Sequence, residues 1–433
     1  FEIAFILCYV VVKVHSLIQI MIVMNLMTAD FAPYAFVIFY MSSFVLNVLG
    51  GKPLWGLVSI IGFGAFCLYV IYLGGAASSS VRDPHSLDYD TYCRTDIPLN
   101  IDNIMPSRNN INGFYQGLQY IPLLSDSLKN PREQVPRALV ICSIVFVLSS
   151  VFLSLSACSQ YPGIKKLTKT KFPLQYGFSD VFNVSLVDSN WFNMPGMYGV
   201  AFCLYYCAGK QIYAISKSGL LFKVFSSTTP VLRTPYLSYF IVTAFGIGMN
   251  IYCFDYPIGY EEIRNTEVVA SHFLLFIAFI TYIIFKINYS SLARSFTSPL
   301  GIYGAVYGMG NYFIGLVGVI FFSGNSYDSV YALLSLFGFA TILFWLFIAK
   351  NQSFSDEEKK MMFKAYLINA NREKRMRILK RNKLEASNSN TKNKGVSTSN
   401  LNRGEVVHSA RLIEPATLLD NYKVPEPIHD TTK

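Results

Sequence analysis

The chain has 433 residues, of which 52% are apolar and 14% are charged, and its net charge is +10. This composition excludes an ordinary soluble domain and is typical of a protein that crosses a membrane several times. It does not indicate a nucleic-acid-binding protein, because much of the positive charge lies in the C-terminal tail and in short loops. The cysteines are scattered, with no CxxC pair and no His/Cys cluster, so we expect no metal and no cofactor.

A membrane-spanning helix needs about 20 predominantly apolar residues. By this measure we predict an all-α polytopic membrane protein with ten spanning segments. They are residues 1–25, 32–50, 54–76, 111–126, 137–160, 195–217, 235–253, 267–287, 303–323 and 328–349. Residues 77–110 and 161–192 are polar and are expected to form loops outside the bilayer. Because the chain opens at Phe1, inside an apolar run, we expect it to be a fragment.

Two ionisable residues fall inside the predicted spans and are candidates for ion coupling. Lys13 lies near the middle of the first span, where a charged side chain is costly and indicates function. His272 lies in the span 267–287. The alternatives are a lysine whose amino group reaches the membrane surface or a polar seam, and a histidine that is packed and hydrogen-bonded.

The segment 111–126 contains residues that break helices. Pro122 cannot donate a backbone hydrogen bond, and Gly117 allows backbone angles that other residues avoid. We therefore expect the helix to break between Gly117 and Pro122. Backbone groups freed in a membrane are tolerated only where they face protein or a water-filled cavity, and many secondary transporters build substrate sites at such breaks. The alternative is a proline-kinked spanning helix that binds nothing.

Lysine and arginine in the short loops indicate the orientation, because cytoplasmic loops carry an excess of both. The side on which the first span begins has short basic loops that include Lys52, Lys129 and Lys217. The other side spreads its basic residues, among them a cluster at 165–171, over longer loops. We therefore expect an integral, multi-pass protein of the plasma membrane with a cytoplasmic C-terminus. The acidic residues 255–267 are expected in an outer loop.

Residues 351–386 are predicted to form a basic amphipathic helix beside the last span. Ten Lys and Arg lie between Lys359 and Lys383, and apolar residues are interleaved with them. Such a helix suits the anionic inner leaflet of a membrane, so we expect contact with anionic lipid at 359–383. A solvated helix is the alternative. Residues 387–433 are polar and are expected to be disordered.

His85 and Asp90 form an HxxxxD pattern, which in some acyltransferases pairs a base with the carboxylate that orients it. The surrounding loop is rich in Asp, so this spacing arises easily by chance, and no second acyltransferase element accompanies it. The sequence also shows no catalytic triad, phosphate-binding loop or GxSxG motif, and we do not expect an enzyme.

Two stretches of the sequence match a known pattern when they are taken together. The first consists of Tyr115-Gln116-Gly117-Leu118-Gln119, Asp126-Ser127-Leu128-Lys129-Asn130-Pro131-Arg132 and Val135-Pro136-Arg137-Ala138. The second consists of Lys210-Gln211-Ile212-Tyr213-Ala214, Lys217-Ser218-Gly219-Leu220-Leu221 and Thr234-Pro235. They resemble the sixth helix and the end of the eighth helix of amino acid–polyamine–organocation permeases. Both lie on the predicted cytoplasmic side, as in that family.

The resemblance implies a LeuT-type inverted-repeat transporter fold, with about ten transmembrane helices present of an expected twelve. On this map residues 1–76 are a partial first repeat, 111–287 are the second repeat and 303–349 are two extra helices. Together they form a permease domain over residues 1–350. The first two helices of the family are missing on this map, and the first of them shares substrate binding with the sixth.

The resemblance also implies a secondary transporter of amino acids, polyamines or related small amines that works by alternating access. The substrate would lie between the broken segment and the first span, at Phe114, Tyr115, Gly117, Gln119 and Tyr120. Gln119 stands where the family has a glutamate, and the helix equivalent to the eighth has no paired hydroxyls of the kind that bind sodium. Proton-coupled or facilitative transport is therefore expected. The alternative is a non-transporting, permease-like nutrient receptor that signals through the cytoplasmic tail.

Overall fold

The computed structural model describes residues 2–82, 117–159, 174–230, 232–289, 296–322, 330–331, 334–335, 337–338, 341–342, 344–349 and 356–393. Within these ranges the chain is built from helices, and no strand is present. The chain divides into two compact units, Phe1–Ala365 and Tyr366–Lys433, and the boundary falls inside the last helix.

The described elements are all helical. The α-helices are α1 (Glu2–Val23), α2 (Ala32–Leu49), α3 (Gly51–Arg82), α5 (Pro131–Ser159), α7 (Gln175–Phe182), α8 (Met194–Lys217), α9 (Tyr236–Asp255), α10 (Pro257–Asn288), α11 (Gly301–Phe322) and α13 (Asp356–Asn393). The 3₁₀ helices are η1 (Ala29–Phe31), η4 (Leu118–Ser127), η5 (Asp188–Asn193) and η6 (Lys223–Ser226), and η7 (Phe344–Ile348) is a short π-helix.

Seven helices of the described chain are long and apolar enough to cross a membrane. They cover Glu2–Val23, Ala29–Leu49, Gly51–Gly75, Pro131–Ser156, Tyr236–Asp255, Pro257–Asn288 and Gly301–Phe321. They correspond to seven of the ten predicted spans, and they fit an all-α, multi-pass membrane protein. For the other three, the structure has η4 within 111–126 and the less apolar α8 at 195–217, while much of 328–349 lies outside the described residues.

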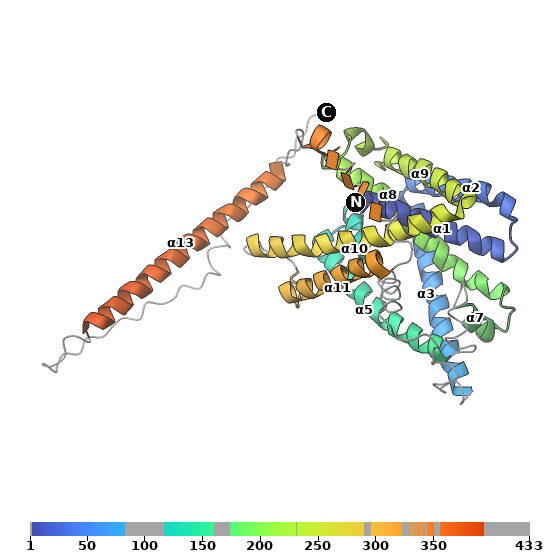
Figure 1. The fold of residues 1–433 in the computed structure, drawn as a ribbon, viewed down its shortest axis with the longest axis horizontal. Coiled ribbons are helices and arrows are strands. Elements are labelled where there is room, and N and C mark those ends of the chain that lie inside the picture. Colours follow the sequence, from blue (N-terminus) through green and yellow to red (C-terminus); the bar gives the residue numbers. More distant parts are fainter. Residues whose placement is uncertain are drawn as a thin grey trace. The chain divides into compact units, whose positions relative to one another are not determined.

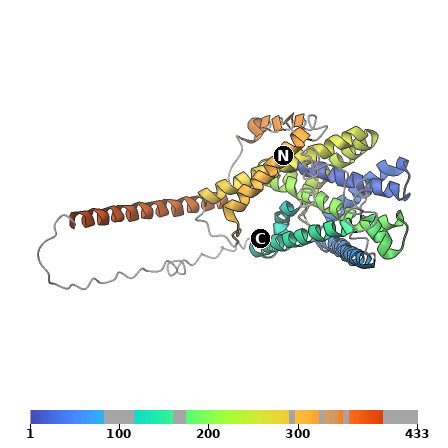
Figure 2. The same ribbon diagram turned by 60° about the horizontal axis from the view of Figure 1, so that its bottom comes forward.

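Helix α1 lies at the centre of the first unit. It packs against α8, α10, α9 and α2, which surround it in both views (Figure 1; Figure 2). Eleven of its 22 residues are buried, and they are spread around the whole helix instead of along one stripe. A helix that is apolar all round belongs to the interior, so the first apolar run of the sequence becomes the core helix of this unit.

Small residues let α2, α8 and α9 pack closely. Tyr40 of α2 is fully buried over Gly246 of α9, and its hydroxyl accepts a hydrogen bond from Asn250 Nδ2 at 2.8 Å. Tyr205 of α8 reaches α9 in a similar way, because its hydroxyl lies 2.7 Å from Thr243 Oγ1. Small residues and interhelical hydrogen bonds of this kind are typical of membrane proteins.

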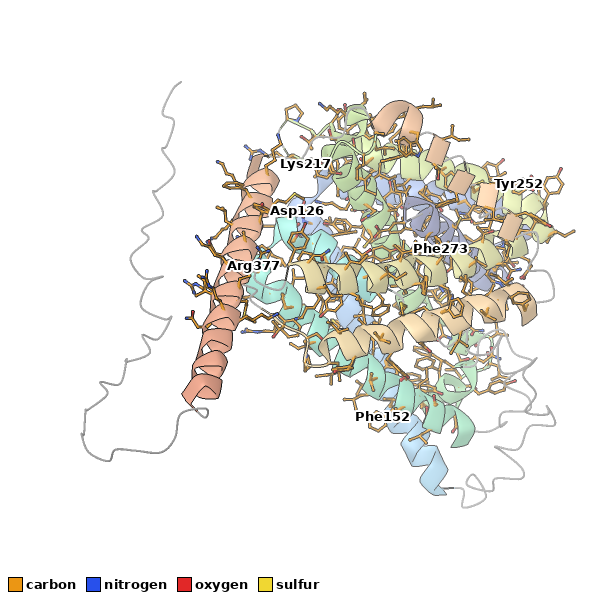
Figure 3. The ribbon with its side chains drawn as sticks, turned by 60° about the vertical axis from the view of Figure 1, so that its left-hand side comes forward. Asp126, Phe152, Lys217, Tyr252, Phe273 and Arg377 are labelled. Carbon is orange, nitrogen blue, oxygen red and sulfur yellow. The ribbon has the colours of Figure 1, made fainter. Side chains whose placement is uncertain are left out.

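Helices α3 and α5 present apolar side chains that no other helix of the described chain covers. Phe63 of α3 is 72% exposed and Phe152 of α5, labelled in Figure 3, is 53% exposed. Apolar side chains exposed on this scale are expected where a helix faces lipid. The two helices also contact each other, so they form one layer of the first unit.

Three predicted loops are partly helical. Residues 257–267, expected in an outer loop, instead form the first turns of α10. Pro257 occupies the first helical turn, where proline is tolerated, and the acidic residues follow in the second turn and beyond. Helix α3 continues to Arg82, and α7 lies within the predicted loop 161–192. Residues 83–110 and 161–173 lie outside the described chain.

Helix α13 provides the predicted basic helix and extends it to Asn393. Met362, Phe363, Tyr366 and Leu367 are exposed, and their spacing places them on one face of the helix. Beyond them, Met376, Ile378 and Leu379 point in different directions around the axis. The apolar face is therefore confined to the first part of α13. The predicted disorder of 387–433 falls on residues that are helical up to Asn393 and lie outside the described chain after it.

Candidate functional site

Gly117, where the sequence predicts that the helix breaks, has a left-handed backbone, and residues 111–116 before it lie outside the described chain. This residue has a φ of 114°, which side chains other than glycine rarely adopt, and η4 follows it as a 3₁₀ helix with Pro122 inside. At the other end of η4, Leu128 is extended, and α5 starts at Pro131. The segment therefore does not continue as an α-helix from Gly117 into α5. The turns of a 3₁₀ helix are tighter than those of an α-helix, so the side chains of η4 are spaced differently from those of its neighbours.

Two buried polar atoms in η4 have no hydrogen-bond partner among the described residues. The Gly117 amide donates to Gln119 Oε1 at 2.9 Å, which fixes the amide group of the side chain against the backbone. The other end of that group, Gln119 Nε2, and the Tyr120 hydroxyl are both buried without a hydrogen bond of good geometry, and the two side chains lie close enough to interact with each other. An unsatisfied buried polar group costs about 1–3 kcal/mol. Two of them in consecutive residues mark a place suited to a polar ligand.

The break lies against α1 and α8. Tyr120 is 3% exposed and stacks on Phe5 of α1, with ring centroids 6.5 Å apart and planes 17° apart. Phe5 stacks in turn on Tyr9, with centroids 5.7 Å apart. Glu2 of α1 and Cys207 of α8 also lie close enough to Tyr120 to interact with its hydroxyl electrostatically. From the sequence, the substrate is expected between residues 111–126 and the first span. The described part of 111–126 lies next to α1, which forms that span.

An ion pair joins the far end of η4 to α8. Lys210 Nζ lies 2.6 Å from Asp126 Oδ2, and the same amino group lies over the Tyr206 ring, 5.7 Å from its centroid. Lys210 is mostly covered, whereas Asp126, which is labelled in Figure 3, is half exposed. The two residues come from the two stretches that carry the family resemblance, so these stretches meet in the structure although they lie far apart in the sequence.

Lys13 points into the protein between α1 and α10. Its amino group lies 5.0 Å from the centroid of the Tyr9 ring. It also interacts electrostatically with Glu267 of α10, which is only 5% exposed. The polar-seam alternative therefore describes this lysine better than an extension to the membrane surface. Tyr9 connects it, through Phe5, to Tyr120 in the break.

Glu267 is the residue that the sequence analysis missed. It was assigned to an outer loop because Glu261, Glu262 and Arg264 precede it closely. The available signal was its position directly before a long apolar run: Glu267 lies three and four residues before Ala270 and Ser271, which are buried on the same face of the helix.

His272 is packed, and it does not join the break. Its Nδ1 lies 2.8 Å from the carbonyl oxygen of Val268, and because a carbonyl only accepts, Nδ1 donates. The ring meets Tyr312 of α11 edge to face, with centroids 5.7 Å apart. The packed, hydrogen-bonded alternative describes its surroundings.

Other predicted site residues lie outside the described chain. These are Phe114 and Tyr115, expected at the substrate site, and His85 and Asp90 of the HxxxxD pattern. In the ranges that the structure describes, no three His, Cys, Asp or Glu side chains gather closely enough to hold a metal ion.

A large apolar cavity of about 1300 Å³ lies elsewhere, at the end of α1 opposite to η4. It is bounded by α1, the link to α2, α2 itself and the start of α8, and its few polar lining residues include Asn25, Thr28 and Ser42. None of the residues predicted to bind substrate lines it. Its lining suits an apolar occupant, whereas the break offers polar atoms that lack partners, so we take the break as the candidate site.

Comparison with models of known protein families gave no match, and no curated protein matches the chain.

Proposed function

We propose that the chain is a secondary transporter that moves amino acids, polyamines or related small amines across a membrane by alternating access. The proposal includes membership of the amino acid–polyamine–organocation permeases, a LeuT-type fold with ten spanning helices, and a location in the plasma membrane with a cytoplasmic C-terminus. It rests on the residue patterns that resemble that family and on the geometry around Gly117.

The observation that carries the proposal is the pair of buried polar atoms in η4 that have no partner beyond each other in the described chain. Gln119 Nε2 donates and the Tyr120 hydroxyl both donates and accepts, so together they suit a carboxylate or an amine. The bond from the Gly117 amide holds Gln119 in place before a ligand arrives. A ligand that satisfies both atoms offsets the cost of burying them, and this gain is specific to a polar guest.

The mechanism follows from the elements that η4 joins. In transporters with broken helices, one group of helices rocks against another around a fixed site. Here η4 is held to α8 by the Asp126–Lys210 ion pair, whose acidic member is half exposed, and to α1 by the stacking of Tyr120 on Phe5. A half-exposed ion pair contributes little net stability and therefore breaks easily. We propose that it opens and closes one side of the site.

Uptake into vesicles tests the proposal. The full chain is reconstituted into liposomes, and uptake of radiolabelled L-leucine, L-arginine and putrescine is measured. We expect the wild type to take up at least one of these solutes. Gln119→Leu should abolish uptake, although this variant still inserts into the membrane and has the wild-type unfolding temperature. Gln134→Leu, at an exposed position of α5, makes the same chemical change away from the break and serves as the control. Wild-type levels of uptake in Gln119→Leu would remove Gln119 from the site, and no uptake by the intact wild type would reject transport of these solutes.

Helix α13 favours a second candidate function, a non-transporting receptor that signals through the tail. A helix of 38 residues with many basic side chains is more than is needed to end a permease domain. Deleting residues 351–433 separates the two functions. A transporter keeps its uptake when the tail is removed, whereas a receptor shows no uptake in either form and loses its signal with the tail.

We also propose that α13 binds anionic lipid through its basic residues at 359–383. Basic side chains beside an anionic leaflet each contribute about 1 kcal/mol of binding free energy. The exposed Phe363 and Tyr366 would enter the interface between head groups and acyl chains.

A further inference from the structure

We propose that Glu267 is the group at which this protein binds its coupling proton, with Lys13 as the positive charge that balances it when the proton is absent. The coupling role rests on the transport function proposed above, whereas proton binding by Glu267 can be tested without it. Neither the sequence pattern nor the family resemblance pointed to Glu267.

The first argument is depth in the membrane. With a rise of 1.5 Å per residue, α1 is about 33 Å long, close to the roughly 30 Å thickness of the hydrocarbon core. Lys13 lies halfway along it. Two contacts between these helices give their direction: Ser16 Oγ lies 3.3 Å from the Tyr260 hydroxyl, and Lys13 interacts with Glu267. Because Glu267 follows Tyr260 in α10 whereas Lys13 precedes Ser16 in α1, the two helices are antiparallel. Lys13 therefore lies near the middle of its span, and Glu267 faces it from the start of the apolar run of α10.

The second argument is the composition of the surroundings. The groups of α1 that face Glu267 are Cys8, Tyr9 and Lys13, of which only the lysine is a cation. On α9, Cys253 lies beyond Cys8, and α11 contributes Tyr312, which contacts His272 one turn further along α10.

On its own helix, Glu267 interacts with Arg264, but that guanidinium makes an ion pair with Glu261 at 2.6 Å. Arg264 and Glu261 are each about half exposed, so water also reduces their influence. Lys13 is therefore the cation that determines whether the buried Glu267 is charged.

The third argument is that Lys13 does not hold the carboxylate in a direct contact. Among the described residues the two make no ion pair within 4.0 Å, and the lysine amino group lies over the Tyr9 ring instead. An ionised Glu267 and Lys13 form a neutral pair. When a proton from water binds the carboxylate, the acid is neutral and the Tyr9 ring remains to stabilise the lysine. The site therefore accepts and releases one proton without a further reactant.

The fourth argument is a connection to the break. Phe5, Tyr9 and Lys13 lie on one face of α1, because they are spaced by four residues each, and Tyr120 stacks on Phe5. A change in the charge that faces Lys13 therefore acts on the same face of α1 that covers the candidate substrate site. This set of contacts gives a physical connection between the two sites, and the transport experiment below tests whether it couples them.

Infrared titration tests proton binding directly. The purified full chain in lipid is titrated from acid to alkaline pH while the C=O stretch of protonated carboxyl groups is recorded. We expect a band from a buried carboxyl group that is missing in Glu267→Gln and present in Glu262→Gln, which makes the same change at an exposed position of α10. In Lys13→Met the midpoint of the band rises by about 1 pH unit or more, because a nearby cation favours the charged carboxylate. A band that survives in Glu267→Gln, or a midpoint that Lys13→Met leaves unchanged, overturns the assignment.

Transport then tests coupling. A gradient of one pH unit supports about tenfold accumulation of a solute that moves with one proton. We expect wild-type vesicles to approach this value with whichever of L-leucine, L-arginine or putrescine they take up. Glu267→Gln should lose accumulation against a gradient yet still exchange labelled for unlabelled solute. Glu267→Asp, which keeps the carboxyl group, should retain part of the accumulation.

Full accumulation in a folded Glu267→Gln variant overturns the coupling role. If Glu267→Gln does not fold, the double variant Lys13→Met/Glu267→Gln removes both charges together and avoids leaving one unpaired. Coupled accumulation in that double variant would show that the pair is only structural. A wild-type protein without any uptake, but with the expected infrared band, rejects the transport proposal while leaving Glu267 as a proton site.

Discussion

Replacing Gly246 by alanine should destabilise the first unit, and the structure gives the size of the effect. A Cβ at this position would lie 2.6 Å from the hydroxyl oxygen of Tyr40 and closer still to two ring carbons. Ordinary contact needs about 3.5 Å, so the ring must move by about 1 Å. Tyr40 is fully buried between α2 and α9, which leaves little room for that movement. Overpacking of this kind costs about 1–3 kcal/mol.

The movement also disturbs a hydrogen bond. Asn250 donates to the Tyr40 hydroxyl at 2.8 Å, and Asn250 Oδ1 already lacks a partner among the described residues. If the bond breaks, the buried Tyr40 hydroxyl is left unsatisfied among the described residues, which adds about 1–3 kcal/mol, whereas Asn250 Nδ2 keeps its bond to the Gly246 carbonyl at 3.1 Å. We therefore expect Gly246→Ala to lower the free energy of unfolding by about 2–6 kcal/mol.

Gly248→Ala is the matched control. Gly248 lies two residues away in the same helix and has no atom within 4 Å of the position of an added Cβ. Alanine gains roughly 0.5–1 kcal/mol over glycine inside a helix, and this gain applies equally to both variants. The difference between them therefore isolates the contact with Tyr40. Unfolding of the purified proteins in mixed micelles measures it, and equal stabilities for the two variants would refute the packing of α2 on α9 described above.

Three further predictions concern the candidate site and α13. Tyr120→Phe should leave stability unchanged or raise it slightly, since the buried hydroxyl makes no hydrogen bond of good geometry in the described chain and interacts only with the neighbouring Gln119, but it should weaken substrate binding. A loss of stability measured by thermal unfolding would show that the hydroxyl is satisfied in the protein. A double-mutant cycle of Asp126→Asn and Lys210→Met should give a coupling energy of about 0.2–1 kcal/mol in unfolding experiments and a larger effect on the rate of uptake. An effect on stability without an effect on the uptake rate contradicts a role of this ion pair in opening the site. Replacing the exposed Lys374, Arg375 and Lys380 by glutamate should lower binding to vesicles containing phosphatidylserine by at least about 100-fold, at roughly 1 kcal/mol per charge. Binding to phosphatidylcholine vesicles should not change. If the wild type and the variant sediment equally with phosphatidylserine vesicles, the lipid contact is rejected.

Long apolar runs predicted the helices well because their ends are set by the apolar sequence itself. The first span was expected over 1–25 and α1 covers Glu2–Val23, and the second was expected over 32–50 and α2 covers Ala32–Leu49. The break at Gly117 was also predictable, because glycine and proline act locally on the backbone.

The positions that the sequence did not reveal depend on contacts between distant segments. The residues just before Glu267 in the sequence are polar, so the sequence alone assigns it to a polar stretch. Only the packing of α10 on α1 buries Glu267 opposite Lys13. The unpartnered state of Gln119 Nε2 likewise follows from how η4 lies against α1 and α8, which local propensity does not determine.

Equilibrium binding most directly tests whether the break receives a small polar solute. Radiolabelled L-leucine, L-arginine and putrescine are added to the purified wild-type protein and to Gln119→Leu, and bound label is counted by scintillation proximity. We predict that at least one solute binds saturably to the wild type and that its Kd rises about tenfold or more in Gln119→Leu, as the loss of a hydrogen bond to a charged ligand requires. A Kd that is the same in both proteins, with equal unfolding temperatures, would show that the solute binds elsewhere.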